Sequence, residues 1–298
     1  FLCTIAFIPC PSSLNISNKT NPAHSIKGPA LLATRFSSLE DLKKVVQIDY
    51  SGKIKPQVRL THKSNGDRVI SVLKTGINET DITDARDGDF WDRVWLSLSS
   101  PYFVMHRKDL LRAFILSRRR HKIFGGGDVA FYDLAETMVH HISKEDLANI
   151  PSKDLSEKGY INTFNHVTAQ AFMTSIFSEQ FADFIADTHE RTNMPELVTG
   201  KFSENQLIDV DNNPVDNYVD IINNEWGQEL GKLLSNKYSI AETTYWTPAL
   251  LADYLNDLQA YYSWVFQIGF EPFTTSDEVV TRFSDKINSV MEGVSGLR

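Results

Sequence analysis

The chain has 298 residues, of which 42% are apolar and 11% aromatic. This composition is enough for a packed core and excludes a largely disordered chain. The formal net charge of −8 argues against general nucleic-acid binding, which needs a positive field to displace counterions. Both cysteines, Cys3 and Cys10, fall in the first ten residues. The rest of the chain therefore has no disulfide framework, cysteine zinc site or thiol nucleophile.

The first ten residues are mostly apolar and are followed abruptly by Pro, Ser and Asn. This pattern is typical of the end of a signal-peptide core and predicts export to a periplasmic, extracellular or surface-attached location. An apolar N-terminal strand is the alternative, which leaves a cytoplasmic location open. Residues 11–35 lack periodicity and are expected to form a linker or disordered arm after the apolar remnant, so that residues 1–35 lie outside the folded domains. No later stretch reaches the ~18 apolar residues of a transmembrane helix.

Residues 36–124 are expected to form a small α+β subdomain. Ser38 to Asp41 form a capping-box pattern that predicts a short helix through Val46. Two apolar or alternating stretches flank Asn65-Gly66, which predicts a β-hairpin. The acidic stretch from Glu79 to Asp89 is expected to be a loop. Helices are expected at two later places, residues 90–96 and 108–116.

Three consecutive glycines, Gly125 to Gly127, make the clearest break in the chain. They lack the Gly-Lys-Ser/Thr ending of a phosphate-binding P-loop, so a turn or hinge is the expected structure. From residue 125 to residue 298 the periodicity predicts helix after helix. The expected ranges are 128–141, 161–178, 179–190, 215–234, 248–268 and 276–290. The predicted fold is mainly α, a helical bundle-like domain with a small α+β N-terminal subdomain.

Two of these helices carry histidines beside polar residues. Asn162 and His166 are four residues apart and share a helix face. His189 and Glu190 stand at the end of the next helix, where the helix dipole favours an imidazolium ion. Position 193 is Asn, so this is not the His-Glu-x-x-His signature of zinc proteases. Each histidine alone is more typical of a structural residue.

The helix at 215–234 is unusual in its interior. It contains Asp220, two asparagines at 223 and 224, and two glycines, Gly227 and Gly231. A glycine inside a helix costs about 1 kcal/mol relative to alanine, so a compensating role is expected. The glycines would let a neighbouring helix approach closely, with Asp220 and Asn223 pointing into the interface. A buried carboxylate needs partners there, and Asn162 and His166 are the predicted ones.

The motifs Asn162-x-x-x-His166, His189-Glu190 and Asp220-x-x-Asn223-Asn224-x-x-Gly227 together resemble an uncharacterised bacterial helical domain family. The resemblance covers 70 residues, from Asn162 to Gly231. It departs from the family pattern at two positions, with Val167 where Ala follows the first His and Asn165 where a basic residue often precedes it. The resemblance implies a helical fold with a shared polar centre, and it implies no particular reaction.

The sequence leaves several functions open. In a metal-assisted hydrolase, His166, His189, Glu190 and Asp220 would be the candidate ligands of a divalent transition metal. These four residues, with Asn223 and Asn224, form the candidate catalytic set, and Asn162 would contact substrate. Alternatively, the same side chains form a structural hydrogen-bond network in a non-catalytic secreted or surface interaction protein. A toxin or effector domain recognised by a protein partner is the third interpretation.

Overall fold

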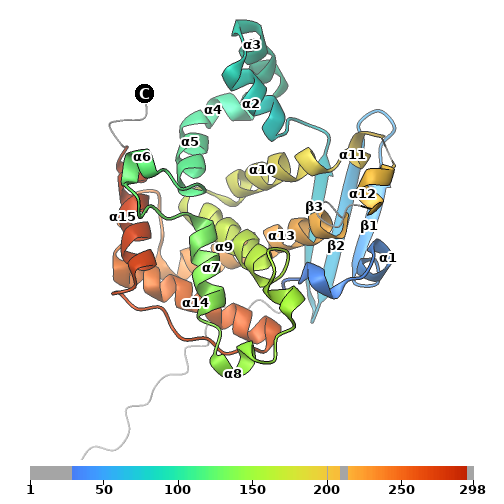
Figure 1. Ribbon diagram of the computed structural model, residues 1–298. Coiled ribbons are helices and arrows are strands. Elements are labelled where there is room, and N and C mark those ends of the chain that lie inside the picture. Colours follow the sequence, from blue (N-terminus) through green and yellow to red (C-terminus); the bar gives the residue numbers. More distant parts are fainter. Residues whose placement is uncertain (1–28, 200, 209–213, 294–298) are drawn as a thin grey trace, which may run out of the picture.

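The computed structural model describes residues 29–199, 201–208 and 214–293, and it confirms a mainly α fold (Figure 1). The strands of the single antiparallel sheet are β1 (Val46–Ser51), β2 (Gln57–Ser64) and β3 (Asp67–Lys74). The helices before the triple glycine are α1 (Leu39–Leu42), α2 (Glu79–Asp87), α3 (Phe90–Ser99), α4 (Pro101–Met105), α5 (Arg107–Leu116) and α6 (His121–Phe124). Those after it are α7 (Phe131–His140), α8 (Lys144–Leu147), α9 (Tyr160–Ile176), α10 (Glu179–Glu190), α11 (Glu196–Thr199), α12 (Glu204–Ile208), α13 (Pro214–Tyr238), α14 (Pro248–Phe266) and α15 (Glu278–Glu292).

Helices α9 and α13 pack against each other at the centre of the molecule. A Cβ atom added to Gly227 would lie 2.7 Å from the Val167 carbonyl oxygen, and one added to Gly231 would lie 2.6 Å from that of Ala171. Both distances are too short for any real side chain, so the two backbones touch only because these residues are glycine. The close helix approach predicted from the glycines is present.

The three strands follow the order β1-β2-β3, and both strand pairs are antiparallel. The predicted hairpin is confirmed. Asn65 and Gly66 both have positive φ angles, 51° and 95°, as a two-residue type I′ turn requires. Strand β1 was not predicted, because the helix capped by Ser38 was expected to run through Val46. The helix instead ends at Leu42, and the alternating residues from Val46 onward pair with β2.

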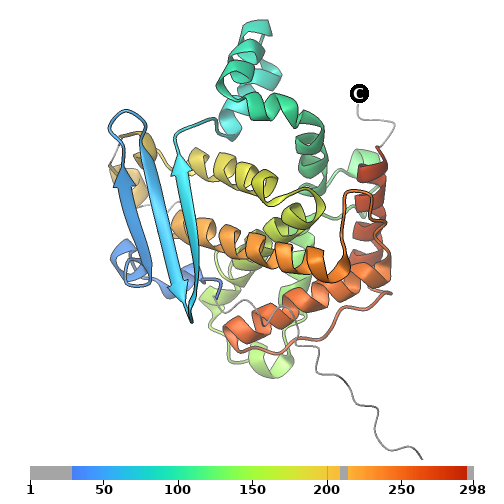
Figure 2. The same ribbon diagram turned by 180° about the vertical axis from the view of Figure 1, so that it is seen from behind.

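The sheet stands at one side of the molecule, next to α13 (Figure 2). Its buried residues Val58 and Leu60 belong to the same hydrophobic core as the helices. On the same face, the Nδ1 atom of His62 accepts a hydrogen bond of 3.0 Å from the indole nitrogen of Trp226. The sheet of the expected N-terminal subdomain therefore shares its core with the helical region.

The acidic stretch expected to be a loop is helix α2. Asn78 and Asp81 form a capping box at its start, so these polar side chains satisfy the amides of the first turn. Helices α2 and α3 form a hairpin that protrudes from the body (Figure 1). Its small apolar cluster contains Ala85 and Leu96 and is separate from the main core.

Residues 29–35, expected to belong to the disordered arm, are packed into the helical region. Ala30 and Leu32 are buried, and the Ala30 amide donates a 3.0 Å hydrogen bond to the Tyr261 hydroxyl. The apolar stretch at residues 1–10 lies outside the described residues, so export stays a prediction. Within the described ranges, no helix combines the length and apolarity needed to cross a membrane.

The boundaries of the longer helices predicted after the triple glycine agree with the structure to within four residues. Thr247 caps α14 by accepting from the Leu250 amide, with Pro248 in the first turn as expected. Gly125 ends α6 with a φ of 84°, so the triple glycine forms a turn. The α7 helix begins at Phe131 rather than at Asp128, whose buried carboxylate instead pairs with Lys286.

The glycine contact gives a first prediction. Gly231→Ala should lower the free energy of unfolding by about 2 kcal/mol, because overpacking between helices outweighs the gain in helix propensity. Chemical denaturation measures this change. Gly126→Ala is the matched control, because a Cβ there meets nothing within 4 Å. Equal stability of the two variants would contradict the close packing.

The buried imidazole gives a second prediction. Burial lowers the pKa of His62 to about 4, whereas an unfolded histidine titrates near 6.5. The unfolded chain therefore takes up this proton first, and stability falls as the pH drops from 6.5 towards 4, by up to about 3 kcal/mol. In His62→Asn this loss should be absent, so the stability difference between the variant and the unsubstituted protein should shrink over that pH window. Parallel pH profiles of the two proteins would refute the assignment.

Candidate functional site

Three helices bring six of the seven predicted polar residues together. Helix α9 contributes Asn162 and His166, the end of α10 contributes His189 and Glu190, and α13 contributes Asp220 and Asn224. The backbone contact at Gly227 and Gly231 sets the distance between α9 and α13. The short side chains on the facing stripes of these helices can therefore reach one another.

His166 lies at the centre of this group, with 13% of its side chain exposed. Its Nδ1 atom is 2.9 Å from Asn224 Oδ1 and 3.9 Å from Glu190 Oε1. Its Nε2 atom is 3.4 Å from Asp220 Oδ2. One imidazole therefore connects the carboxylate of α10 to the carboxylate of α13.

Each of the two buried carboxylates accepts a hydrogen bond from an asparagine. The Asn224 Nδ2 atom donates to Glu190 Oε1 at 3.0 Å, and the Asn162 Nδ2 atom donates to Asp220 Oδ1 at 2.8 Å. An amide donor brings no positive charge. The carboxylates are thus held in position without being neutralised by these contacts.

His189 forms the exposed edge of the group, with 46% of its side chain accessible. Its Nδ1 atom is 3.2 Å from Glu79 Oε1, which extends from the start of α2. This hydrogen bond is the main reason why the pKa of His189 is raised to about 9, with a further contribution from the charge of Glu190. At neutral pH the imidazole is therefore protonated.

The buried groups favour their uncharged forms. Burial lowers the pKa of His166. Burial, aided by the Asp220 charge, raises the pKa of Glu190 to about 7, and burial together with the Asp216 charge raises the pKa of Asp220. Burial is the largest cause of each of these three shifts.

Three side chains of this group have the arrangement of metal ligands. His166, His189 and Glu190 each offer one nitrogen or oxygen atom, and these atoms all lie within 4.8 Å of one another. Two imidazoles and one carboxylate form a ligand set found in catalytic zinc sites. Asp220, also predicted as a ligand, lies instead against the Nε2 atom of His166, while Glu190 lies nearer the Nδ1 atom.

Asn223 does not join the group, although the sequence suggested that it points to the same interface as Asp220. Its Oδ1 atom accepts from the Leu31 amide at 2.7 Å, and its Nδ2 atom donates to the Leu31 carbonyl at 2.9 Å. Thr163 donates to the same carbonyl. The Asn223 amide thus holds the buried N-terminal segment against α9 and α13.

Three residues near the site were not predicted as part of it. Lys158 donates a 2.8 Å hydrogen bond to Asp216, whose other oxygen is 3.5 Å from Asn162. Asp216 precedes Asp220 by one helical turn, and this spacing was a signal that could have identified it. Glu79 gave no such signal, because it belongs to the stretch that was expected to be a loop.

A small cavity adjoins the group on the far side of Glu190. Its volume is about 10 Å³, roughly the room that one water molecule needs. Its lining residues are Ser71, Asp183, Ala186, Asp187, Glu190, Ile221, Asn224, Glu225 and Gln228. Among the described residues, the exposed edge at His189 is therefore the more open approach to the candidate ligands.

Comparison with protein-family models, curated proteins and solved structures finds no match to this chain. The interpretation of the site therefore depends on its own residues.

The contacts of Asn223 give a third prediction. Asn223→Ala should lower the free energy of unfolding by about 1–3 kcal/mol, because it removes the partners of buried backbone groups at Leu31. Denaturant unfolding measures the loss. Asn149→Ala, on an exposed helix end, should change stability by less than about 0.5 kcal/mol. A loss at Asn223 no larger than at Asn149 would show that the Leu31 contact is dispensable.

Proposed function

We propose that this chain is a metal-assisted hydrolase in which His166, His189 and Glu190 bind one divalent transition-metal ion. The observation that carries the proposal is the convergence of these three ligand atoms within 4.8 Å of one another, beside the buried carboxylate of Asp220. A divalent ion at these atoms would favour the ionised form of the Glu190 carboxyl group, which burial otherwise disfavours.

The position of His166 supports a cation at one of its nitrogens. A neutral imidazole carries one N–H group, yet His166 has an oxygen close to each nitrogen, from Asn224 on one side and Asp220 on the other. A metal ion bound to Nδ1 would place the proton on Nε2, where Asp220 accepts it. A carboxylate that holds the second nitrogen of a histidine ligand is a common support in metal sites.

The ligand distances are compatible with a metal after a small adjustment. Nitrogen and oxygen ligands about 2.0–2.2 Å from a tetrahedral zinc ion lie roughly 3.4 Å apart. The three atoms here lie within 4.8 Å of one another, so the widest pair would have to close in by up to about 1.4 Å. His189 is the most exposed of the three, and its imidazole would have to rotate away from Glu79 and lose its proton to bind.

A three-ligand site leaves a coordination position for water. A metal ion lowers the pKa of bound water to about 7, so that hydroxide forms at neutral pH. Held by His166, His189 and Glu190, the ion would supply a nucleophilic water for the hydrolysis of an ester or a phosphoester. Asn224 and Asn162 are the amides beside the candidate ligands and their carboxylate neighbour, and they would orient the reacting groups.

A specific observation favours a second function, that of a non-catalytic interaction protein with a structural polar network. The same side chains form hydrogen bonds that join α9, α10 and α13, and the adjacent cavity has room for about one water. Networks of this kind can specify a single packing arrangement. Under this alternative no metal is needed.

Metal content separates the two proposals. Protein purified without chelators should contain one transition-metal ion per chain by mass spectrometry. Removal of that ion with EDTA should lower the melting temperature, because the ion stabilises only the folded state. Glu190→Gln should abolish the stoichiometric metal while keeping the side-chain volume.

Asn223→Ala is the matched control, because it replaces a buried α13 asparagine that does not touch the ligands. It should lose stability and still retain metal. If the unsubstituted protein contains no metal, and its melting temperature is unchanged by EDTA and by added Zn²⁺ or Mn²⁺, the metal-site proposal is wrong. The structural network is then the better account.

A further inference from the structure

Helix α3 carries large apolar side chains that are mostly exposed. Trp91, Trp95 and Leu98 are 71%, 72% and 72% exposed. Their spacing of four and three residues places them on one side of the helix. Phe90, 68% exposed, packs its ring edge against Trp91. These four residues are called the α3 stripe.

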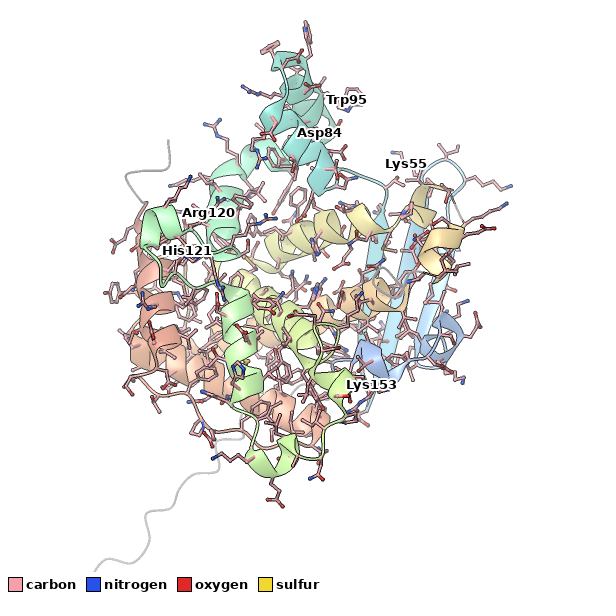
Figure 3. The ribbon with its side chains drawn as sticks, viewed as in Figure 1. Lys55, Asp84, Trp95, Arg120, His121 and Lys153 are labelled. Carbon is pink, nitrogen blue, oxygen red and sulfur yellow. The ribbon has the colours of Figure 1, made fainter. Side chains whose placement is uncertain are left out.

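The α3 stripe lies on the protruding hairpin, and Trp95 points outward from it (Figure 3). The opposite side of α3 is buried through Leu96, which packs with Ala85 and Ile77. The hairpin is also fixed to the body through α4, where the Tyr102 ring lies 4.7 Å from that of Phe184 on α10. The stripe therefore lies on a hairpin that packs against the body. Helix α3 is apolar on its exposed side as well as on its buried side.

The exposed area of the stripe is large enough for a specific interface between two copies of the chain. A fully buried aromatic side chain covers about 150–250 Å², so four large side chains at about 70% exposure present roughly 600 Å². Two copies facing each other would bury about 1,200 Å², above the roughly 1,000 Å² expected for a specific interface. Single exposed apolar residues are ordinary, whereas contiguous patches of this size mark interaction sites.

The charges of the hairpin favour a protein surface over an anionic membrane. Residues 79–99 contain six acidic and two basic residues, which would be repelled by anionic lipid headgroups. Most of these acidic side chains have partners within the hairpin. Asp81, Asp89 and Asp92 cap the starts of helices, and Asp87 forms an ion pair with Arg86. The remaining negative charge would repel a second copy of the chain weakly at low salt, and less at high salt.

We propose that the α3 stripe is the contact surface of a symmetric homodimer, in which the stripe of one copy packs against the same stripe of a second copy. A two-fold contact uses the same patch on both chains and closes without further growth. Such an arrangement covers both tryptophans at once. The proposal is independent of the chemistry of the polar site, which lies on other helices.

Sedimentation velocity of the full chain over a wide concentration range tests the proposal. The expected result is a concentration-dependent species of twice the monomer mass, with a dissociation constant that falls as the salt concentration rises. Trp95→Glu should weaken the dimer at least about a hundredfold, as expected for a central aromatic residue at an interface. Ile54→Glu is the matched control, since Ile54 is 94% exposed in the loop between β1 and β2, and it should dimerise normally.

Three outcomes would overturn the proposal. One is a monomer at every concentration, and another is a dimer that Trp95→Glu leaves unchanged. The third is binding of the monomer to phosphatidylcholine vesicles that Trp95→Glu abolishes, which would assign the stripe to a membrane surface. Circular dichroism of both variants would establish that they fold, because both substituted side chains are exposed.

Discussion

The backbone contact between α9 and α13 is the constraint on which the rest of the structure depends. It exists because Gly227 and Gly231 present no side chain to the carbonyls of Val167 and Ala171. Two glycines inside a helix of 25 residues weaken its intrinsic stability, and tertiary packing makes up for this cost. The gain is a short distance between the two helices along their whole contact.

That short distance explains why the polar group uses asparagine, aspartate and histidine. Asn162 reaches Asp220, and Asn224 reaches both His166 and Glu190, all with side chains shorter than lysine or arginine. The amides fix the carboxylates without bringing a positive charge, and burial is the main reason why the pKa values of Glu190 and Asp220 are raised. An arrangement built only for stability gains little from such carboxylates, because apolar side chains of similar size would fill the same space at lower electrostatic cost.

The sequence was most informative where one helix carried several unusual residues. The cost of Gly227, Gly231 and the paired asparagines pointed to a close helix contact and to a polar interface, and both are present. It was less informative where a contact joins distant segments. The hydrogen bond between Glu79 and His189 spans 110 residues, and it starts from an acidic stretch whose helix depends on capping by Asn78. The buried segment at residues 29–35 was missed for a similar reason, since its order depends on partners such as Asn223 and Tyr261 far along the chain.

The neighbouring residues Asn223 and Asn224 of α13 have different roles. Consecutive residues on a helix point about 100° apart, so the two amides face different neighbours. Asn223 satisfies both backbone groups of Leu31, whereas Asn224 connects His166 with Glu190. A motif of paired asparagines therefore combines one residue that holds the fold with one that orients the candidate ligands. Substituting the two positions separately distinguishes folding from function within a single turn of α13.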